Sequence, residues 1–485
     1  MAYEALYPSP LSTKLTFYGG LDEIGGNKIL LEDHGTKVFL DFGKSFSTRS
    51  RYYEWTSGPR LANGIGDFVA LGILPDIKGI YRKDLLQLAR LPCAEDKFVD
   101  GVILTHAHAD HADYISFLRE DIPIWMGATC RAVISALEQE KNADVEFEIT
   151  KFKERPAKGR AEPLHRKIET FRTGSKVKID SIEIEPVHVD HSLPGCYGFV
   201  IHTSSSTIIY SGDLRIHGNR PDLTTDFINK SCDSKPEWML CEGTRMGETT
   251  ISSSEKEVFE ICLHYARLRD SGLFLFADYS YKDVDRFLTF YKVAKATGRK
   301  ILITPKTARY ISRLAENNPD LGKALPPPTD DSIGIYKNRI KSGTYSDEDY
   351  DDSDLDLYKQ TNVWTSDDVR GDSSKVIMAI GPYHLNELID LNPRRGIYIH
   401  SASEPFNEEG EINEKRIDSW VGRFGLAKIQ AHCSGHASGP DLNRILEEIS
   451  PKKIIPIHTE QPELFEMFHG DKVVRPTGSP PTVEL

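Results

Sequence analysis

One seven-residue stretch constrains this chain more than any other, because it gathers four possible metal ligands in a short space. Residues 105–111 read Thr-His-Ala-His-Ala-Asp-His, directly after the apolar run Gly101-Val102-Ile103-Leu104. The apolar run is typical of a short buried strand. Alternate positions of an extended segment point the same way, so the first two histidines can face one ion while the aspartate and the third histidine turn toward a second. Imidazoles and a carboxylate suit zinc or a similar divalent ion.

Other polar residues also stand at the ends of apolar strands. Open α/β sheets carry their chemistry at the carboxyl ends of strands. One such residue is unremarkable, but a series of them indicates a single convergent site. For Asp41, which directly follows the expected strand Lys37–Leu40, we favour a role in orienting a ligand histidine over a simple turn-forming role. The others stand at or near the ends of later apolar segments: His188, His191, Asp213, Glu242, His436 and His458.

Composition limits the class of protein. The chain has 485 residues, with 39% hydrophobic and 27% charged residues, which is typical of a globular protein of two or three domains. No apolar run approaches the length of about 18 residues that a membrane span needs. Residues 1–12 lack a secretory signal pattern, and the seven cysteines are scattered without a Cys-x-x-Cys pair, so we expect a cytoplasmic protein with reduced thiols and no membrane partner. The net charge of −13 requires any nucleic-acid surface to be a local basic groove.

The pattern of elements changes twice along the chain. Residues 1–249 are strand-rich, apart from a mixed insertion at about 50–98. Residues 250–395 alternate helices with short strands, which predicts a second α/β domain. Residues 396–485 return to the first pattern. Within the middle region, residues 347–356 carry seven acidic side chains in ten positions, and we expect this acidic loop to be solvated and disordered.

Taken together, these motifs resemble those of the β-CASP nucleases of the metallo-β-lactamase superfamily, and among them ribonuclease J in its short, archaeal-like form. The run at 106–111 matches the second superfamily motif. His-Ser-Leu-Pro at 191–194 resembles the ribonuclease J histidine motif, and Ser-Gly-Asp at 211–213 resembles the motif of a metal-bridging aspartate. Glu242, His436 and His458 stand at β-CASP motifs A, B and C. The chain departs from the family at 458–460, which read His-Thr-Glu instead of His-Gly-Glu, and at 376–382, which lack Thr-Gly-Ser-Gln-Gly-Glu.

The resemblance implies a fold and a ligand set. The fold is a metallo-β-lactamase αββα sandwich, split in sequence, with an inserted α/β β-CASP domain. Two divalent ions are implied, zinc first, with manganese or magnesium as alternatives. His191, rather than His188, becomes a ligand, and Asp213 bridges the ions. One ion is assigned to His106, His108 and His191, and the other to Asp110, His111 and His458.

The resemblance also implies a function: hydrolysis of RNA phosphodiester bonds by two-metal hydroxide attack, as a 5′→3′ exonuclease that prefers 5′-monophosphate ends and has possible endonuclease activity. Asp110 is expected to position the hydroxide. His436 is expected to stabilise charge or protonate the leaving oxygen, and Glu242 to hold His436. A terminal phosphate is expected beside the start of a helix, on Ser434, Gly435, His436 and Ser438.

Alternatives remain at this point. In the family, a histidine at motif C accompanies RNA-directed members, so His458 favours single-stranded RNA over DNA as the substrate. A DNA-directed β-CASP nuclease is the first alternative, and a small-molecule metallohydrolase is a weaker one. An inactive binding subunit would have lost ligands, whereas every expected ligand is present here. We also expect a homodimer or another homo-oligomer.

Overall fold

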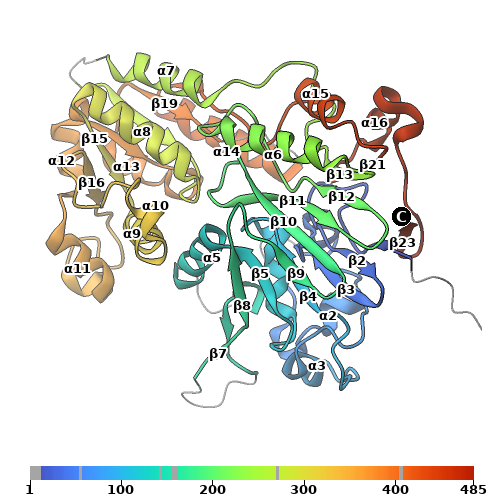
Figure 1. The fold of residues 1–485 in the computed structure, drawn as a ribbon. Coiled ribbons are helices and arrows are strands. Elements are labelled where there is room, and N and C mark those ends of the chain that lie inside the picture. The colour runs from blue at the N-terminus through green and yellow to red at the C-terminus, as the bar shows by residue number, and fades with distance from the viewer. Residues whose placement is uncertain (1–11, 54–56, 141–144, 156–161, 269–271, 403–407) are drawn as a thin grey trace, which may run out of the picture. The chain divides into compact units, whose positions relative to one another are not determined.

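The computed structural model describes residues 12–53, 57–140, 145–155, 162–268, 272–402 and 408–485. They form two compact units (Figure 1). The first comprises Met1–Ile216, Arg220–Ile251 and Gly435–Leu485, and the second comprises His217–Asn219 and Ser252–Ser434. The first unit is therefore built from both ends of the sequence.

The first unit contains two mixed sheets that share one core. The first sheet has the strand order β22 (Thr477–Gly478), β23 (Pro481–Glu484), β1 (Lys14–Phe17), β2 (Ile29–Asp33), β3 (Thr36–Leu40), β4 (Gly101–Leu104), β5 (Ile124–Gly127) and β8 (Ile168–Phe171). The second has the order β21 (Lys453–Ile457), β13 (Trp238–Glu242), β12 (Thr207–Tyr210), β11 (Cys196–His202), β10 (Ile182–Val189) and β9 (Val177–Ile179). A two-stranded ribbon joins β6 (Lys151–Phe152) to β7 (Leu164–His165).

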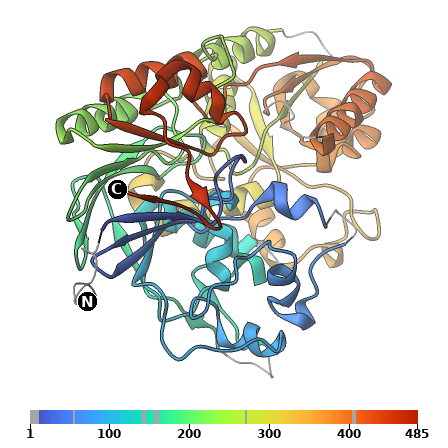
Figure 2. The ribbon, with the colours of Figure 1, turned by 90° about the vertical axis from the view of Figure 1, so that its right-hand side faces the viewer.

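Apolar side chains of the two sheets meet in one hydrophobic cluster. Leu15 and Ile29 come from the first sheet, and Phe199 and Ile208 from the second. The two ends of the chain meet in the first sheet, because β23 pairs antiparallel with β1 (Figure 2). The last strand of the second sheet, β21, pairs in parallel with β13. These long-range pairings make the carboxyl-terminal segment an integral part of the first unit.

Helices complete the first unit. Helix α6 contacts β10 and β11 of the second sheet and also contacts α15, while α5 contacts β5 and β8 of the first sheet. The helices are α1 (Phe46–Ser50), α2 (Gly66–Ala70), α3 (Lys83–Leu88), α4 (Ala109–Ala112), α5 (Ala128–Glu140), α6 (Pro221–Ser234), α15 (Gly439–Ile449) and α16 (Pro462–His469). The predicted α/β sandwich, split in sequence and carrying an inserted α/β unit, is confirmed.

The second unit is built on an all-parallel sheet. Its order is β17 (Val363–Trp364), β16 (Ile333–Tyr336), β15 (Lys300–Ile303), β18 (Val376–Ala379), β14 (Phe274–Asp278), β19 (Gly396–His400) and β20 (Leu426–Gln430). Its helices are α7 (Glu255–Ala266), α8 (Val284–Thr297), α9 (Pro305–Asn317), α10 (Pro319–Gly322), α11 (Asp352–Gln360), α12 (Ser366–Gly371), α13 (Glu387–Leu391) and α14 (Glu408–Arg423). Parallel strands need crossover connections, which explains the alternating pattern seen in the sequence.

The end of the second unit differs from the sequence expectation. Strands β19 and β20 were expected to lie in the last segment, 396–485. Instead β19 pairs with β14, and β20 pairs with β19. Since both strands complete the parallel sheet, the second unit continues to Ser434 rather than ending at residue 395.

The acidic run at 347–356 is ordered, which corrects the expectation of a disordered loop. Asp351 caps helix α11, its side chain accepting a hydrogen bond from the backbone N–H of Asp354. Acidic residues in the first turn of a helix interact favourably with the helix dipole. The carboxylate of Asp354 also pairs with Arg309, and Asp349 accepts a hydrogen bond from the backbone of Ser342. These cationic and N–H partners outweigh the mutual repulsion of the carboxylates.

Parts of the insertion at 50–98 are packed against neighbouring segments of the chain. Phe68 contacts the rings of Tyr114 and Phe117. Arg82 is fully buried, pairs with Asp84, and lies 3.7 Å from the ring centroid of Phe152. The insertion is therefore part of the first unit.

Among the described helices, none combines the length and the hydrophobicity that a membrane span requires.

Candidate metal centre

The ligand stretch lies in a loop that β3 and β4 hold in place. After β4 ends at Leu104, the chain passes through His106 and His108 into the short helix α4, which contains Asp110 and His111. Backbone hydrogen bonds fasten this loop to the segment after β3, from Phe42 N–H to the His111 carbonyl and from Lys44 N–H to the Ala109 carbonyl.

The approach of these two segments is close enough to require glycine. A Cβ atom added to Gly43 would stand 1.7 Å from the backbone oxygen of Asp110. One added to Gly25, whose φ is +79°, would stand 2.5 Å from a carboxylate oxygen of the same aspartate. Gly25 and Gly43 thus let the backbone pass directly behind Asp110.

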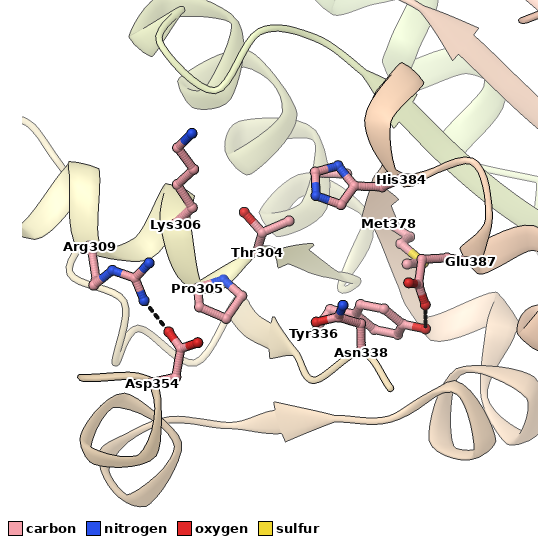
Figure 3. Close-up of a pocket in the computed structure, with 11 residues that line it drawn as sticks. Thr304, Pro305, Lys306, Arg309, Tyr336, Asn338, Asp354, Met378, His384 and Glu387 are labelled. Atoms are coloured by element: carbon pink, nitrogen blue, oxygen red, sulfur yellow. Dashed lines mark hydrogen bonds and ion pairs between the residues drawn. The ribbon is translucent and has the colours of Figure 1, made fainter. Parts of the chain in front are cut away.

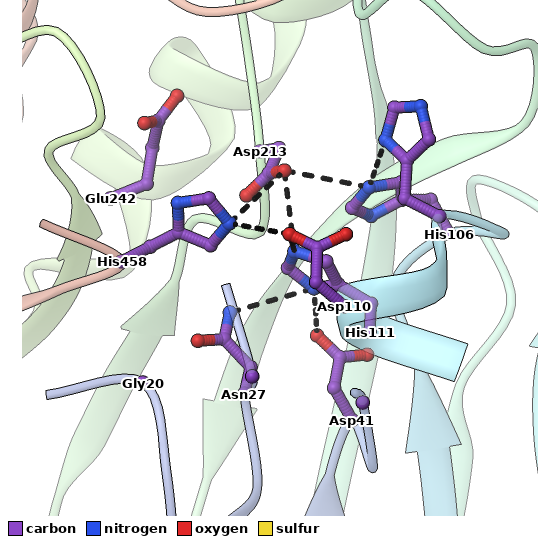
Figure 4. Close-up of polar contacts among 12 residues, drawn as sticks. Gly20, Asn27, Asp41, His106, Asp110, His111, Asp213, Glu242 and His458 are labelled. Carbon is purple, nitrogen blue, oxygen red and sulfur yellow. Dashed lines mark hydrogen bonds and ion pairs between the residues drawn. The ribbon is translucent and has the colours of Figure 1, made fainter. Parts of the chain in front are cut away.

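Seven predicted ligands converge in two groups that share Asp213. Within each group, the candidate ligand atoms all lie within 4.8 Å of one another. The polar contacts around Asp213 are drawn in Figure 4. The first group is His106, His108, His191 and Asp213, and the second is Asp110, His111, His458 and Asp213. This division is the one that the alternating spacing of residues 106–111 predicted.

Asp213 stands between the groups. Its Oδ2 lies 3.5 Å from Nε2 of His106, 3.2 Å from Nε2 of His111 and 3.7 Å from Nε2 of His458. Among the buried side-chain atoms of the described residues, Asp213 Oδ1 and His111 Nε2 have no hydrogen-bond partner. Burying such atoms without a partner costs free energy, so their convergence fits a bound cation.

The first ligand group is also arranged in a way that suits a bound cation. Nδ1 of His108 lies 2.9 Å from Nε2 of His106 and 3.0 Å from Nε2 of His191. Neutral imidazoles present lone pairs on their unprotonated nitrogens. Three ring nitrogens that point at one small volume are therefore best stabilised by an ion that accepts those lone pairs, and the donor set suits zinc.

Contacts behind four of the five ligand histidines fix the orientation of their rings. Nδ1 of His111 lies 2.8 Å from Oδ2 of Asp41, which also accepts a hydrogen bond from the Tyr210 hydroxyl at 2.7 Å. The backbone N–H of Thr105 donates to the other oxygen of Asp41 at 2.8 Å. Such outer contacts determine which nitrogen of a histidine faces the metal. Asp41 thus occupies the orienting position expected for it.

His106, His191 and His458 are held in the same way. Nδ1 of His106 lies 3.0 Å from the Thr105 hydroxyl, and Nδ1 of His191 lies 2.5 Å from the Gly435 carbonyl oxygen. Nδ1 of His458 lies 2.8 Å from Oγ1 of Thr244. Each of these contacts leaves the Nε2 atom of the ring facing the cluster.

The two groups differ in their proton affinity. In the first, burial lowers the pKa of His106 and His191 and lowers that of His108 to about 4, so these rings are neutral. In the second, burial is outweighed by nearby carboxylates, chiefly Asp213. The pKa of His111 is raised, and that of His458 is raised to about 9. Without a metal, protons therefore supply the positive charge that the carboxylates require.

His436 and Glu242 form a pair beside the cluster. Nδ1 of His436 lies 3.2 Å from Oε1 of Glu242, a fully buried carboxylate. Burial disfavours the charged ring, but Glu242 and Asp213 outweigh that effect and raise the pKa of His436. The ring centroid of His436 is 5.0 Å from that of His191 and 5.6 Å from that of His458. His436 thus lies next to the proposed ligands with a raised proton affinity, and Glu242 contacts its Nδ1 atom.

The residues expected to bind a terminal phosphate are divided. Gly435 and Ser438 lie in the first unit, whereas Ser434 is the last residue of the second. Ser438 precedes helix α15, but its buried hydroxyl donates to Asp441 at 2.8 Å and accepts no hydrogen bond from the helix backbone.

His188 lies outside both ligand groups. Its ring instead stacks on Tyr197 at a centroid distance of 4.8 Å.

Several positioning residues were not identified from the sequence. Thr105, Tyr210 and Thr244 each contact a candidate ligand or its carboxylate partner. Hydroxyl residues at strand ends are common and carry no metal-ligand signature, so only the pairing of distant strands reveals these contacts. Of these three residues, Thr105 could have been suspected from the sequence, because it directly precedes the first candidate ligand.

Comparison with known protein families and proteins gives consistent matches. A family model described as a beta-lactamase superfamily domain matches residues 75–227. A second, described as a Zn-dependent metallo-hydrolase RNA specificity domain, matches residues 427–466. Ribonuclease J of Mycolicibacterium smegmatis is 25% identical over 479 residues, which cover 94% of this chain and 71% of that protein. Ribonuclease J of Pyrococcus abyssi is 24% identical over 463 residues, which cover 92% of this chain and 90% of that protein.

A solved structure shares the fold. The crystal structure of a protein of unknown function from Enterococcus faecalis covers 98% of this chain and is itself covered completely. The TM-score is 0.73 at 22% sequence identity. The likeness therefore extends over both units.

Proposed function

This chain belongs to the β-CASP branch of the metallo-β-lactamase superfamily, and from that membership we propose that it is a metal-dependent ribonuclease that hydrolyses RNA phosphodiester bonds. The observation that carries the proposal is the convergence of seven ligand side chains on two groups that share Asp213. Similarity to ribonuclease J over more than nine-tenths of the chain supports RNA as the substrate.

The ligand groups are proposed to hold two divalent ions, with zinc as the first candidate. When bound, such ions acidify a water molecule and neutralise charge on a scissile phosphate. The protein supplies a rigid, buried ligand set. Four of the ligand histidines are oriented by contacts on the far side of their rings, made by Asp41, Thr105, Gly435 and Thr244. The neutral rings of the first group bind a cation without first losing a proton.

Two further side chains are proposed to handle protons and charge. Oδ2 of Asp110 lies 3.1 Å from Nε2 of His458, and its carboxylate can position an attacking water. His436 is held by Glu242 on its Nδ1 side. Its raised pKa increases the protonated fraction of the ring, and in the protonated form it can stabilise phosphate charge or protonate the leaving oxygen.

We further propose 5′→3′ exonucleolytic cleavage that prefers 5′-monophosphate ends, with endonucleolytic cleavage as a second activity. Gly435 and His436 stand beside the metal centre in the segment before α15. Because Ser438 already donates to Asp441, its contribution would be to shape the start of the helix rather than to donate to the phosphate.

Incubation of metal-loaded protein with three RNAs tests this proposal. The RNAs share one sequence and carry a 5′-monophosphate, a 5′-triphosphate or a 5′-hydroxyl. Release of mononucleotides from the monophosphate form alone is the expected result. Internal products from all three forms would replace the exonuclease proposal with an endonuclease. Equal cleavage of a single-stranded DNA of the same sequence would contradict RNA specificity, and no cleavage of any strand would contradict the nuclease assignment.

A further inference from the structure

A pocket within the second unit lies at a place where parallel sheets bind ligands. Its volume is about 170 Å³, and it lies at the carboxyl ends of β15, β16 and β18 (Figure 3). The strand β15 lies between β16 and β18. From β15 the chain passes through α9 to β16 on one side, while from β18 it passes through α13 to β19 on the other side.

This divergence makes the pocket a topological switch point. Where two adjacent parallel strands send their connections in opposite directions, a crevice opens outside their carboxyl ends, and open α/β sheets bind their ligands there. The pocket is lined by Thr304, which follows β15, and by Met378 near the end of β18. The sheet topology by itself therefore selects this position as a candidate binding site.

One wall of the pocket is cationic. Lys306 and Arg309 project from the first turns of α9, a helix with no acidic residue in its first turn. The guanidinium of Arg309 pairs with Asp354. The ammonium of Lys306 lies 4.6 Å from the ring centroid of Tyr281, and no carboxylate of the described residues lies within ion-pair distance of it. A lysine beside a helix N-terminus is complementary to a phosphate group.

The opposite wall offers a nonpolar surface and hydrogen-bond acceptors. Tyr336 is nearly buried and donates its hydroxyl hydrogen to Oε2 of Glu387 at 2.7 Å. Among the described residues, the other carboxylate oxygen of Glu387 and the side-chain amide of Asn338 have no hydrogen-bond partner, although both residues line the pocket. Met378 adds a buried thioether. Aromatic and thioether groups suit a flat ring, and acceptors suit the N–H groups on its edge.

We propose that this pocket binds a nucleoside monophosphate, with the phosphate at Lys306 and the start of α9 and the base against Tyr336 and Met378. The cationic wall and the acceptor wall face each other across the pocket in Figure 3. A nucleotide carries the complementary pair of features, an anionic end and a flat ring with N–H donors. The volume of about 170 Å³ is below the roughly 300–1,000 Å³ of sites that enclose a drug-sized ligand, so a nucleotide bound here extends partly beyond the pocket.

Isothermal titration calorimetry of the metal-free, full-length protein tests the site. Metal removal separates this binding from hydrolysis, so its outcome is independent of the proposed nuclease function. The four nucleoside monophosphates, the matching nucleosides and inorganic phosphate are titrated in turn. At least one monophosphate is expected to bind more tightly than its nucleoside and than phosphate. Phosphate binding as tightly as every nucleotide would overturn the proposal.

Variants locate the bound nucleotide. Lys306→Met is expected to raise Kd about tenfold, as the loss of one charge-assisted contact does. Glu387→Gln should weaken binding while retaining the shape of the pocket. The matched control Lys323→Met removes another exposed lysine of the same unit and should leave Kd unchanged. His436→Ala removes any contribution from the terminal-phosphate site proposed beside the metal centre, and the effect of Lys306→Met on Kd should persist in that background. If His436→Ala abolishes binding and Lys306→Met does not, the nucleotide binds in the first unit and the proposal fails.

A 5′-phosphorylated trinucleotide separates two sources of the ligand. If it binds as well as the mononucleotide, and Lys306→Met weakens both, the pocket accepts the terminal nucleotide of a strand. If only the mononucleotide binds, the ligand is the free nucleotide. The absence of binding by any nucleotide overturns the proposal in either form.

Discussion

Each unit of this protein contains a buried polar cluster, and the two clusters obtain their positive charge in different ways. In the second unit, the fully buried Arg286 donates to Glu255 at 2.9 Å and to the Ser401 carbonyl at 2.8 Å. We call these residues, with His432 and Cys433, the Arg286 cluster. In the metal centre, the ion-pair partners of Asp110 and Asp213 among the described residues are all histidines. One cluster carries its cation in the chain, whereas the other must acquire a proton or an ion.

This difference separates a structural cluster from a functional one. A guanidinium that stays charged satisfies its carboxylate under all ordinary conditions. Histidines do so only while protonated, and a divalent ion can replace those protons. A buried group of carboxylates and imidazoles without a permanent cation is therefore a candidate metal site, whereas a similar group closed by arginine is a candidate for stability.

Asp213→Asn should have the largest effect, because it removes the carboxylate that both ligand groups share. We expect hydrolysis of 5′-monophosphate RNA to fall by at least about a thousandfold, since bound ions supply several kcal/mol of charge stabilisation. Metal content after dialysis, measured by mass spectrometry, should fall in parallel. Retention of both metal content and activity would remove the distinction between the clusters.

Arg286→Met should instead destabilise the protein while leaving its metal content unchanged. Loss of the guanidinium leaves Glu255 buried without its cation, which costs about 3–5 kcal/mol in comparable cases. Urea unfolding monitored by circular dichroism measures this loss. The double variant Arg286→Met/Glu255→Leu should recover part of it. A single variant as stable as the unchanged protein would show that the Arg286 cluster is not structural.

Thr244→Val tests whether the orientation of His458 affects metal affinity. The hydroxyl near Nδ1 of His458 is lost while the side-chain volume is kept. Outer contacts of this kind typically change metal affinity by about 10–100-fold. Thr289→Val is a matched control, since it removes a hydroxyl that donates to Glu255 in the Arg286 cluster. Zinc affinity measured with a competing chelator should fall for the first variant alone; equal affinities would contradict a positioning role for Thr244.

The smallest expected effect is a pH dependence of opposite sign in the two clusters. In metal-free protein the pKa of His458 is raised from 6.5 to about 9, so its stabilising contribution is present below pH 6.5 and is lost as pH rises through 9. Burial and Arg286 lower the pKa of His432 from 6.5 to about 4, so its contribution is lost as pH falls from 6.5 through 4.

Urea unfolding of metal-free protein across this pH range measures both contributions. His458→Gln should flatten the alkaline side of the stability profile, and His432→Gln should flatten the acid side. If His458→Gln altered only the acid side, the assignment of protons to the metal centre would be wrong.

The parts of the site that could be predicted are those with local spacing. Alternation along residues 106–111 was sufficient to divide the ligands between two groups. Asp213 and His458 could be identified as candidates because they stand at the ends of apolar strands. The contact of Thr244 with His458 could not be predicted in the same way. It depends on the parallel pairing of β13 with β21, which are far apart in the sequence. Composition likewise could not show that the acidic run meets Arg309, which lies 45 residues from Asp354 in sequence.

The second unit illustrates the same limit for the fold. The alternation of helices and strands predicted a parallel α/β sheet, since each crossover leaves its own periodic pattern. The membership of β19 and β20 depends on hydrogen bonds to β14 and to each other. Short apolar strands look alike in either unit, so their partners cannot be read from periodicity.

The most direct test of the central claim is anomalous X-ray diffraction, at the zinc absorption edge, from crystals of zinc-loaded protein. The account predicts two peaks, one bounded by His106, His108 and His191 and the other by Asp110, His111 and His458, with Asp213 reaching both. An absence of anomalous density among these side chains, in crystals of protein that cleaves RNA, would contradict it.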